Sequence, residues 1–449
     1  MATILFALAL VGASGKPNVL VILADDVGWA EFGFQGAKDI PTPNIDSIAR
    51  NGVRFPQGYV SGPYCSPTRA GLMTGRYQTR FGHEFNSTAS KKTGLSLQEK
   101  TFPTFLKEAG YATCAVGKWH LGAGEDYWPT KRGFDEYFGT LANTPYYHPN
   151  QFVDSRAGIG PKKLEDPNFY TTDAYGERAV EWIGKQNGPW FLYLPFNAQH
   201  APLEAPKEAL DKFAHIADEK RRSFAAIMSK MDDAVGKVLS KIREKKEEEN
   251  TLIFFFSDNG GPTRQTTSNN LPLRGFKATT WEGGVRIPFC MQWKGTLSPG
   301  VYERPVIQLD ILPTSLAAVG AAIPKNLDGV DLMPFLTGRT KIDQPHTTLY
   351  WRFGDQWAIR HGDWKLVVGN GGGKEPELYN LKEDIAEKNN LAAATPDKVA
   401  ELKSLWDAWN KEQAPALTPK EQPPKANPKQ KGKGKKKAVD PPQLLDDDD

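Results

Sequence analysis

Four short apolar runs, each followed by polar residues, limit what this chain can fold into. The runs cover residues 19–24, 111–116, 190–196 and 251–256. Continuous apolar runs of this length are typical of strands that are buried on both faces. Between them, apolar positions recur at helical spacing over residues 42–51, 101–110 and 218–249. Strands that alternate with helices predict an α/β fold with a mainly parallel sheet covered on both faces.

The polar residues after these runs fall at one predicted edge of the sheet. In chain order they are Asp25 and Asp26, Lys118 and His120, His200, and Asp258 and Asn259. In a parallel sheet, ligands bind beyond the carboxyl ends of the strands. We therefore expect these side chains to gather at one site.

The acidic part of this set predicts a metal site. Its members are Asp25, Asp26, Asp258 and Asn259. Three carboxylates and an amide offer only oxygen donors, which favour Ca²⁺, with Mg²⁺ as the second choice, and suit Zn²⁺ poorly. Each Asp-containing pair, taken alone, is also typical of a turn. Two such pairs at the same edge of one sheet favour the metal site.

Basic residues predicted near the same edge indicate an anionic substrate. They are Arg69, Lys118, His120, His200 and Lys277. Cations that gather beside a metal favour a tetrahedral, anionic group in the substrate.

Cys65 differs from the other two cysteines in its sequence context. Cys114 and Cys290 lie in apolar runs, which predicts small core residues. Cys65 lies in a Gly- and Pro-containing segment just before Pro67, which indicates a loop. A thiolate nucleophile, activated by Arg69 or by a metal, is one interpretation. Cys-dependent phosphatases have a longer spacing between Cys and Arg than the three residues found here, so that class fits badly.

The remaining segments predict the domain organisation. Residues 1–15 are apolar and then small, which predicts a signal peptide and export. Residues 16–336 are expected to form the catalytic domain, and residues 337–410 an α+β subdomain with an antiparallel sheet and a closing helix. Residues 411–449 are rich in Lys and Pro, which predicts a disordered tail. We expect no membrane span, and the net charge of +3 does not indicate nucleic-acid binding.

Three sequence blocks resemble the signatures of the type I sulfatase family. They are Cys65-Ser66-Pro67-Thr68-Arg69 with the residues up to Arg76, the block 110–120, and the block 273–288. The similarity runs from about Pro17 to Leu391. It implies an alkaline-phosphatase-like α/β/α sandwich with a mainly parallel central sheet, and a smaller C-terminal α+β domain with an antiparallel sheet.

The resemblance also implies two cofactors. A separate formylglycine-generating enzyme would oxidise Cys65 to formylglycine. Calcium would be held by Asp25, Asp26, Asp258 and Asn259, and the modified residue 65 would complete the site.

The resemblance implies that the protein hydrolyses sulfate esters. Arg69 and Lys118 would orient the hydrated aldehyde, and Lys118, Lys277 and the metal would bind the sulfate. One hydroxyl of the gem-diol attacks sulfur and displaces the alcohol. His200, with Lys277, would protonate the leaving oxygen. His120 would take the proton of the second hydroxyl, so that sulfate leaves and the aldehyde returns.

The predicted export and the resemblance together indicate that the substrate is a sulfated polysaccharide or oligosaccharide. We also expect the protein to be secreted or periplasmic. Candidate contacts to the sugar are Arg80, His83, Glu84, Asn86, Arg352 and His361.

Two other functions stay open at this point. A phosphonate monoester or phosphodiester hydrolase of the same superfamily can share the Cys-x-Pro-x-Arg motif. A non-catalytic protein that binds sulfated glycans on a sulfatase scaffold belongs to another class.

Overall fold

The computed structural model describes residues 15–86, 93–369 and 375–417. The predicted signal peptide, apart from Gly15, and the predicted tail beyond Leu417 lie outside the described residues, so both stay predictions. Residues 411–417 of the predicted tail are instead ordered, because the N–H groups of Ala414 and Leu417 donate to the carbonyls of Thr79 and Gly82 at 3.0 and 2.8 Å. Among the described helices, none is long and apolar enough to cross a bilayer.

Ten strands of the described chain form the central sheet, in the order β11-β2-β10-β9-β1-β8-β4-β5-β6-β7. They are β1 (Asn18–Ala24), β2 (Val53–Arg54), β4 (Ala112–Lys118), β5 (Glu136–Thr140), β6 (Phe152–Asp154), β7 (Ile159–Lys162), β8 (Trp190–Pro195), β9 (Thr251–Ser257), β10 (Phe289–Gln292) and β11 (Gly300–Val301). β1 is parallel to both β8 and β9, and β4 is parallel to β8. The four apolar runs are therefore adjacent strands, which confirms the α/β fold.

Strand β1 shows why these runs are apolar at every position. All seven of its residues are buried. Val19, Val21 and Leu23 belong to the core on one face of the sheet, and Leu20 and Ile22 to the core on the other. A strand that is covered on both faces has no position for a solvated side chain, so its sequence does not alternate.

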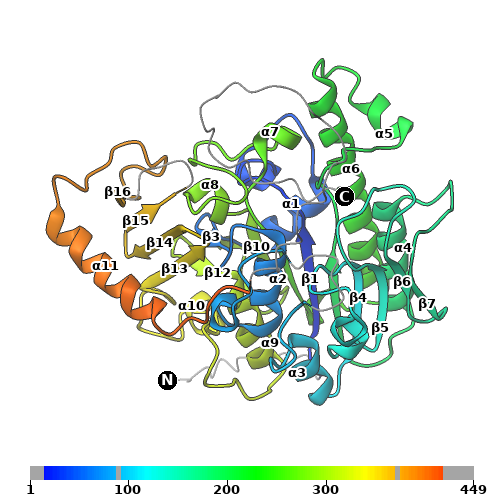
Figure 1. Ribbon diagram of the computed structural model, residues 1–449. Coiled ribbons are helices and arrows are strands. Elements are labelled where there is room, and N and C mark those ends of the chain that lie inside the picture. The colour runs from blue at the N-terminus through cyan, green and yellow to red at the C-terminus, as the bar shows by residue number, and fades with distance from the viewer. Residues whose placement is uncertain (1–14, 87–92, 370–374, 418–449) are drawn as a thin grey trace, which may run out of the picture. The chain divides into compact units, whose positions relative to one another are not determined.

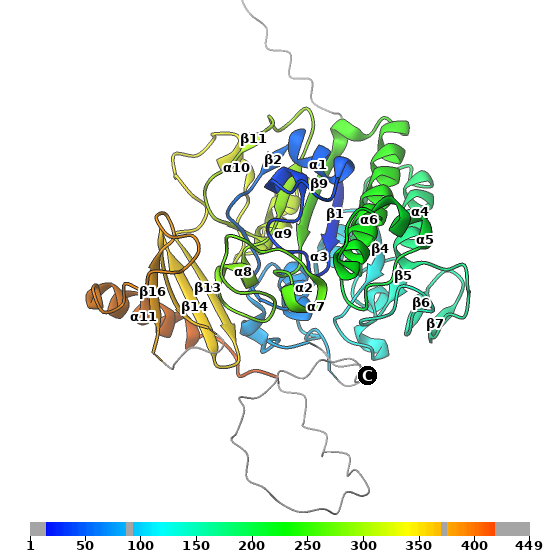
Figure 2. The same cartoon turned by 90° about the horizontal axis from the view of Figure 1, so that it is seen from above.

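Helices cover both faces of the central sheet (Figures 1 and 2). One face carries α1 (Pro43–Arg50), α4 (Thr171–Gly184) and α6 (Glu219–Glu244). The other carries α2 (Cys65–Thr74), α3 (Phe102–Glu108) and α9 (Ile311–Ala318). Helix α6 begins close to the predicted residue but ends at Glu244, and residues 248–250 form a separate 3-10 turn.

Short elements connect these layers. The short helices are α5 (Lys207–Lys212), α7 (Thr263–Thr266), α8 (Glu282–Val285) and α10 (Met333–Leu336). Strands β3 (Gly58–Tyr59) and β12 (Val306–Ile307) pair with each other. The 3-10 helices cover Gly33–Gln35, Gln78–Phe81, Glu125–Tyr127, Pro129–Lys131, Glu248–Asn250 and Gln308–Asp310.

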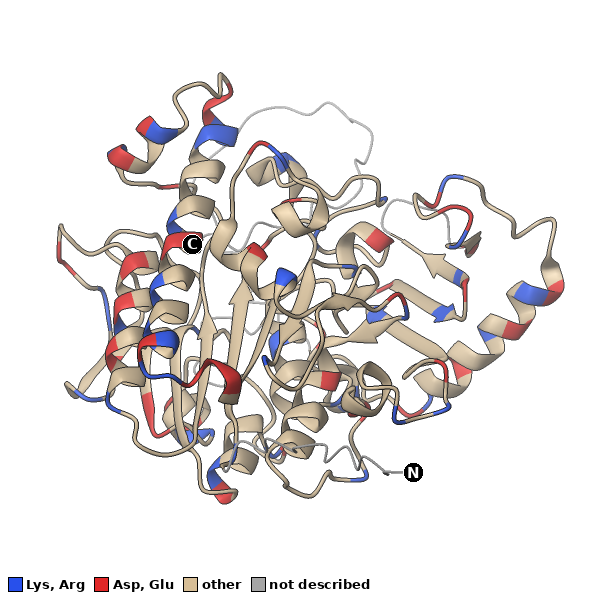
Figure 3. Ribbon diagram, turned by 180° about the vertical axis from the view of Figure 1, so that it is seen from behind, with Lys and Arg blue, Asp and Glu red and all other residues tan. Residues whose placement is uncertain are grey.

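A smaller antiparallel sheet follows in the C-terminal part of the described chain, in the order β13-β14-β15-β16. Its strands are β13 (Thr348–Phe353), β14 (Gln356–His361), β15 (Trp364–Val368) and β16 (Glu377–Asn380). Helix α11 (Pro396–Asn410) buries Leu402, Trp406 and Trp409 against it. Acidic and basic residues are interspersed along the rest of α11 (Figure 3). The antiparallel sheet is as predicted, and the domain boundary at residue 336 stays a prediction.

A buried charged network links the C-terminal sheet to helix α8. The Nζ atom of Lys365 in β15 lies 2.9 Å from a carboxylate oxygen of Glu282 and 2.9 Å from one of Glu387. Tyr59 donates its hydroxyl hydrogen to Glu282 at 2.7 Å. The backbone N–H of Glu282 donates to Glu387 at 2.7 Å. The block 273–288 contains both Lys277 and helix α8. This network therefore fixes the α8 part of the block to the smaller sheet.

Candidate active site

The polar strand ends meet at the carboxyl edge of the central sheet. Asp25 follows β1, Asp258 follows β9, Lys118 ends β4, and His200 lies beyond β8. The strands β9, β1, β8 and β4 are consecutive neighbours. The sheet topology therefore brings four distant chain segments to one place.

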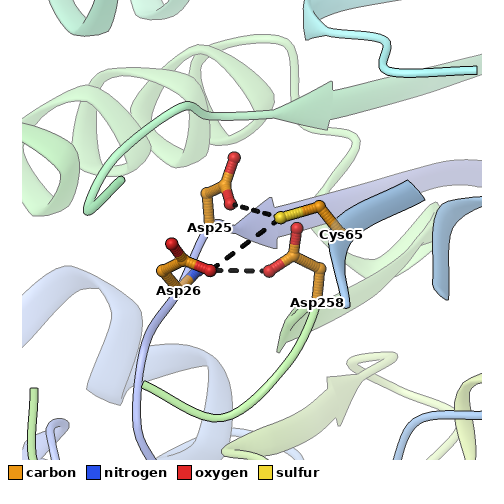
Figure 4. A group of neighbouring side chains, drawn as sticks. All are labelled: Asp25, Asp26, Cys65 and Asp258. Carbon is orange, nitrogen blue, oxygen red and sulfur yellow. Dashed lines mark hydrogen bonds between the residues drawn. The ribbon is translucent and has the colours of Figure 1, made fainter. Parts of the chain in front are cut away.

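Three carboxylates and a thiol lie together at this edge (Figure 4). Ligand atoms of Asp25, Asp26, Cys65 and Asp258 all lie within 4.8 Å of one another, and the four residues are buried. The Sγ atom of Cys65 lies 3.4 Å from Oδ1 of Asp25. We call these four residues the carboxylate cluster. Burying so many carboxylates is costly unless cations compensate their charge.

Asn259 adds an amide oxygen beside the carboxylate cluster. Its Nδ2 donates to Oδ1 of Asp26 at 2.7 Å and to the carbonyl of Gly260 at 3.0 Å. Its Oδ1 is buried and has no hydrogen-bond partner among the described residues. An unpaired buried acceptor costs about 1–3 kcal/mol. A divalent cation that prefers oxygen ligands fits both this orphaned oxygen and the three carboxylates.

Arg69 and Lys118 compensate part of the negative charge. Nη2 of Arg69 donates to Asp25 at 3.1 Å and to Asp258 at 2.8 Å, and Nη1 donates to the Lys118 carbonyl at 2.7 Å. Nζ of Lys118 donates to Asp25 at 2.5 Å. Burial alone would raise the pKa of Asp25, but Lys118 and Arg69 outweigh it and hold that pKa well below its usual range. Burial and the neighbouring Asp25 carboxylate raise the pKa of Asp258.

Cys65 begins helix α2, so the interpretation of its surroundings as a loop was wrong. Tyr64 is the extended residue before the helix, and every residue of α2 is buried. Pro67 is tolerated because it lies in the first helical turn, where backbone N–H groups have no partner within the helix. The positive end of the helix dipole thus lies at residue 65.

The surroundings of Cys65 disfavour a thiolate. Burial, followed by the carboxylates of Asp25 and Asp258, raises the pKa of the Cys65 thiol well above its usual range. A cysteine that acts directly as a nucleophile needs the opposite shift. Without a bound cation, these surroundings therefore give the thiolate interpretation no support.

Lys277 and His200 face the carboxylate cluster from its less buried side. Nζ of Lys277 donates to Oδ2 of Asp26 at 2.8 Å, and Nε2 of His200 lies 3.7 Å from the same oxygen. Their side chains are 10 % and 9 % exposed. Nδ1 of His200 lies 2.6 Å from the Ala201 carbonyl, so Nδ1 carries a proton and Nε2 faces the site. Burial, then Lys277 and Lys118, lowers the pKa of His200.

His120 follows β4 and is almost fully buried. Its backbone has a φ of 59°, and its carbonyl accepts a hydrogen bond from Ser66 Oγ at 2.6 Å. Burial, then Lys118 and Arg69, lowers the pKa of His120 well below its usual range. These surroundings therefore favour the neutral imidazole.

Two candidate sugar contacts instead support the residue next to Cys65. Nε2 of His83 lies 2.7 Å from Ser66 Oγ, and Oδ1 of Asn86 accepts from the Ser66 N–H at 3.1 Å. Both side chains are buried. Burial lowers the pKa of His83 to about 4. The structure thus places His83 and Asn86 as supports of the first turn of α2.

Arg80, Glu84 and Arg352 are held in ion pairs. Nη2 of Arg80 lies 2.7 Å from Oδ1 of Asp328. Nε of Arg352 donates to Oε1 of Glu84 at 2.8 Å. These charged groups are therefore already paired within the protein.

His361 lies at the far end of β14. At the near end, Gln356 donates to the carbonyl of Ala278, next to Lys277, at 2.9 Å. His361 instead pairs with Thr348, with 2.7 Å between Nδ1 and Oγ1. Five strand residues span about 16 Å. The structure therefore does not bring His361 to this site.

Sequence reasoning missed Tyr146 and Phe353. The hydroxyl of Tyr146 donates to the carbonyls of Asn197 and His200, each at 3.1 Å, and so holds the turn that carries His200. The ring of Phe353 packs on Tyr64 with 5.6 Å between the centroids. A single aromatic residue outside a motif gives no sequence signal for such a long-range contact.

Residues 17–321 of this chain match the sulfatase family. The chain belongs to the sulfatase family. Residues 276–413 of this sulfatase also match the C-terminal region of N-sulphoglucosamine sulphohydrolase. N-acetylgalactosamine-6-sulfatase of Canis lupus familiaris is 34 % identical over 384 residues, which cover 79 % of this chain and 72 % of the canine protein. The resemblance found in the sequence is confirmed, and the chain is an enzyme of the sulfuric ester hydrolase class.

Solved structures agree with this assignment. Ps i-CgsB, in complex with k-i-k-neocarrahexaose, superposes with a TM-score of 0.81 at 32 % identity, over 90 % of this sulfatase and 94 % of that chain. The phosphonate monoester hydrolase of Agrobacterium radiobacter reaches a TM-score of 0.64 at 20 % identity, over 87 % of this sulfatase and 96 % of that chain. The second likeness shows a shared fold and nothing more.

Proposed function

We propose that this sulfatase hydrolyses sulfate esters of a polysaccharide or oligosaccharide, with formylglycine at position 65 and Ca²⁺ in the carboxylate cluster. The observation that carries the proposal is the convergence of three buried Asp carboxylates, Arg69 and Lys118 around Cys65. Once a maturing enzyme has oxidised Cys65, the hydrated aldehyde supplies the nucleophilic hydroxyl.

The calcium ligands would be Asp25, Asp26, Asp258, Asn259 and residue 65. The orphaned Oδ1 of Asn259 supports this assignment, because a cation gives that oxygen a partner. When bound, the ion supplies positive charge that stabilises charge on a sulfate oxygen.

The basic side chains of the site would bind the sulfate and orient it. Nζ of Lys118 and Nζ of Lys277 already lie at hydrogen-bond distance from cluster carboxylates, so an anion at the cluster is within their reach. Arg69 is buried and engaged on several sides, so its task is to hold Asp25 and Asp258 in place around residue 65.

The two histidines would move protons. Nδ1 of His200 is held by the Ala201 carbonyl, so Nε2 is the atom that takes up a proton and delivers it to the leaving oxygen. A bound sulfate beside His200 favours its protonated form. His120 would accept the proton from residue 65 when sulfate is released.

A sulfated glycan is the substrate class that we infer. One relative is named for a 6-sulfate on N-acetylgalactosamine, and a structural neighbour was solved with a neocarrahexaose. The predicted signal peptide supports a secreted or periplasmic location. A formylglycine-generating enzyme would be the partner during maturation.

Rates on 4-nitrophenyl sulfate and on bis(4-nitrophenyl) phosphate test the reaction class, with the Cys65→Ala variant as the control. We expect faster turnover of the sulfate ester, and none by the variant. Faster turnover of the phosphodiester would support the phosphonate or phosphodiester hydrolase instead. Tight binding of sulfated glycans with no turnover by protein that carries formylglycine would support a non-catalytic role.

A further inference from the structure

We propose that Tyr64, Phe85 and Phe353 form an aromatic platform that binds the apolar face of the pyranose ring carrying the sulfate. This inference rests on the proposed function and extends it to substrate recognition. It gives the C-terminal sheet a part in specificity, through the hairpin tip between β13 and β14.

The aromatic platform lies where the carboxylate cluster is least enclosed. The cluster side chains are fully buried, whereas that of Lys277 is 10 % exposed. Tyr64 directly precedes Cys65 and is half-buried. Nζ of Lys277 lies 5.1 Å from the centroid of the Tyr64 ring. The Tyr64 ring is therefore within reach of a substrate whose sulfate contacts Lys277.

The three rings come from three separate segments. Tyr64 precedes α2, Phe85 follows the 3-10 helix Gln78–Phe81, and Phe353 ends β13. The ring centroids of Tyr64 and Phe353 lie 5.6 Å apart, and those of Phe353 and Phe85 lie 5.2 Å apart. Phe353 is the buried middle ring, while Tyr64 and Phe85 each keep a solvated part.

A sugar ring fits such a surface by its chemistry. One face of a pyranose presents C–H groups, which pack well on aromatic faces, while its hydroxyls stay free to bind polar groups. Ligand sites of small molecules combine aromatic walls with a few placed polar groups in this way. Here the polar groups are those of the sulfate site, whose Lys277 Nζ lies over the Tyr64 ring.

Hydrogen bonds fix the hairpin tip relative to Lys277. The N–H of Gly354 donates to Oε2 of Glu84 at 3.2 Å. Gln356 donates to the carbonyl of Ala278, the residue after Lys277, at 2.9 Å. A platform that is already in place loses little conformational entropy when a ligand binds.

The charges around the platform favour a neutral ring over a second sulfate. Arg352, the basic neighbour of Phe353, is neutralised by its ion pair with Glu84. Asp355, at the exposed hairpin tip, is acidic. Attraction for anions is therefore concentrated at Lys277 and Lys118, and the platform itself is suited to the uncharged face of the sugar.

The test compares sulfate release from methyl sulfate, which has no ring, with release from four sugars: the 6-sulfates of N-acetylgalactosamine, N-acetylglucosamine and galactose, and galactose 4-sulfate. Sugars that are not hydrolysed are measured as competitive inhibitors of methyl sulfate hydrolysis. The variant is Phe85→Ala, because Phe85 is a half-buried outer ring of the platform and packs on Phe353 with 5.2 Å between the centroids. Phe85→Tyr keeps the ring, and Ile342→Ala removes a remote apolar side chain that is 67 % exposed.

We expect Phe85→Ala to raise KM or Ki for the best-bound sugar about tenfold, which corresponds to loss of one aromatic contact. Its kcat, and KM for methyl sulfate, should stay within about twofold of the wild type. The two other variants should behave like the wild type. Equal changes in KM or Ki for methyl sulfate and for the sugar in Phe85→Ala, or no change for either, would contradict the proposed platform. Failure of the wild type to release sulfate from any substrate would instead count against the proposed function.

Discussion

Arg69 donates two hydrogen bonds to Oδ2 of Asp258, at 3.2 Å from Nε and at 2.8 Å from Nη2, and both side chains are fully buried. Cys65 and Arg69 are four residues apart in α2, so they lie on the same face of that helix. The spacing of the Cys-x-Pro-x-Arg motif therefore has a structural reason. It directs residue 65 and its supporting guanidinium toward the same carboxylate cluster.

Loss of the Arg69 guanidinium should destabilise the fold. In Arg69→Met, Asp258 loses its guanidinium partner and Asp25 keeps only Lys118, which should lower the free energy of unfolding by about 3–5 kcal/mol. Urea unfolding measures this. Arg304→Met is the matched control, because its pair with Asp343 is about half exposed and should be worth about 1 kcal/mol or less. Equal losses of unfolding free energy in the two variants would show that the buried ion pair stabilises the fold no more than the exposed one.

Calcium should stabilise the protein. An ion that binds only the folded state adds about 2.7 kcal/mol at a concentration 100 times its Kd. We expect EGTA to lower Tm, calcium to restore it, and magnesium to restore it less. The variant Asn259→Leu removes the orphaned oxygen and should shrink the calcium-dependent rise in Tm. A Tm that does not respond to EGTA or to calcium would refute the metal assignment.

His83 should make stability fall in mild acid. Its folded pKa is about 4, below the usual value of 6.5 that applies to the unfolded chain, because burial disfavours the charged ring. Between these values the unfolded state binds more protons, so stability is complete above about pH 6.5 and falls toward pH 4. The contribution of His83 to the loss in free energy of unfolding from pH 7 to pH 5 should be about 2 kcal/mol.

Urea unfolding at both pH values checks this prediction. The variant His83→Gln should lose about 2 kcal/mol less than the wild type between pH 7 and pH 5. His215→Gln, at an exposed position, should show the wild-type loss. An unchanged loss in His83→Gln would mean that other groups cause the acid sensitivity.

Removing the Lys365 ammonium alone should destabilise the fold more than removing it together with the charge of Glu387. In Lys365→Met, Glu282 and Glu387 keep buried carboxylates without their ammonium partner, which should cost about 3–5 kcal/mol. Adding Glu387→Gln removes one of these charges and should recover part of the loss. Lys398→Met breaks a partly exposed pair with Glu401 and serves as the control.

Differential scanning calorimetry of the three variants measures these effects. A double variant that is less stable than Lys365→Met would contradict the account of this network.

The fold and the gathering of polar strand ends were predictable because both follow from local patterns. A strand buried on both faces must be apolar throughout, and β1 and β9 show this in their sequences. Parallel pairing then places Asp25 and Asp258 at one edge. No long-range information is needed for either step.

The ion-pair partners of the candidate sugar contacts were not predictable because they lie far away in the chain. Arg80 is paired with Asp328, and Arg352 with Glu84, across 248 and 268 residues. Pairs at such distances leave no pattern in a single sequence. The prediction of a loop around Cys65 was wrong for a different reason. A proline such as Pro67 is common both in loops and near the start of a helix, so the local sequence does not distinguish them.

The central claim is that residue 65 becomes formylglycine and carries the turnover of sulfate esters. Its most direct test is mass spectrometry of the peptide around residue 65, from protein produced with and without a formylglycine-generating enzyme, alongside sulfate release by the same two samples. We predict that thiol-to-aldehyde conversion and sulfate release appear together, in proportion to each other. Full sulfate release from protein that still carries an intact Cys65 thiol would contradict the claim.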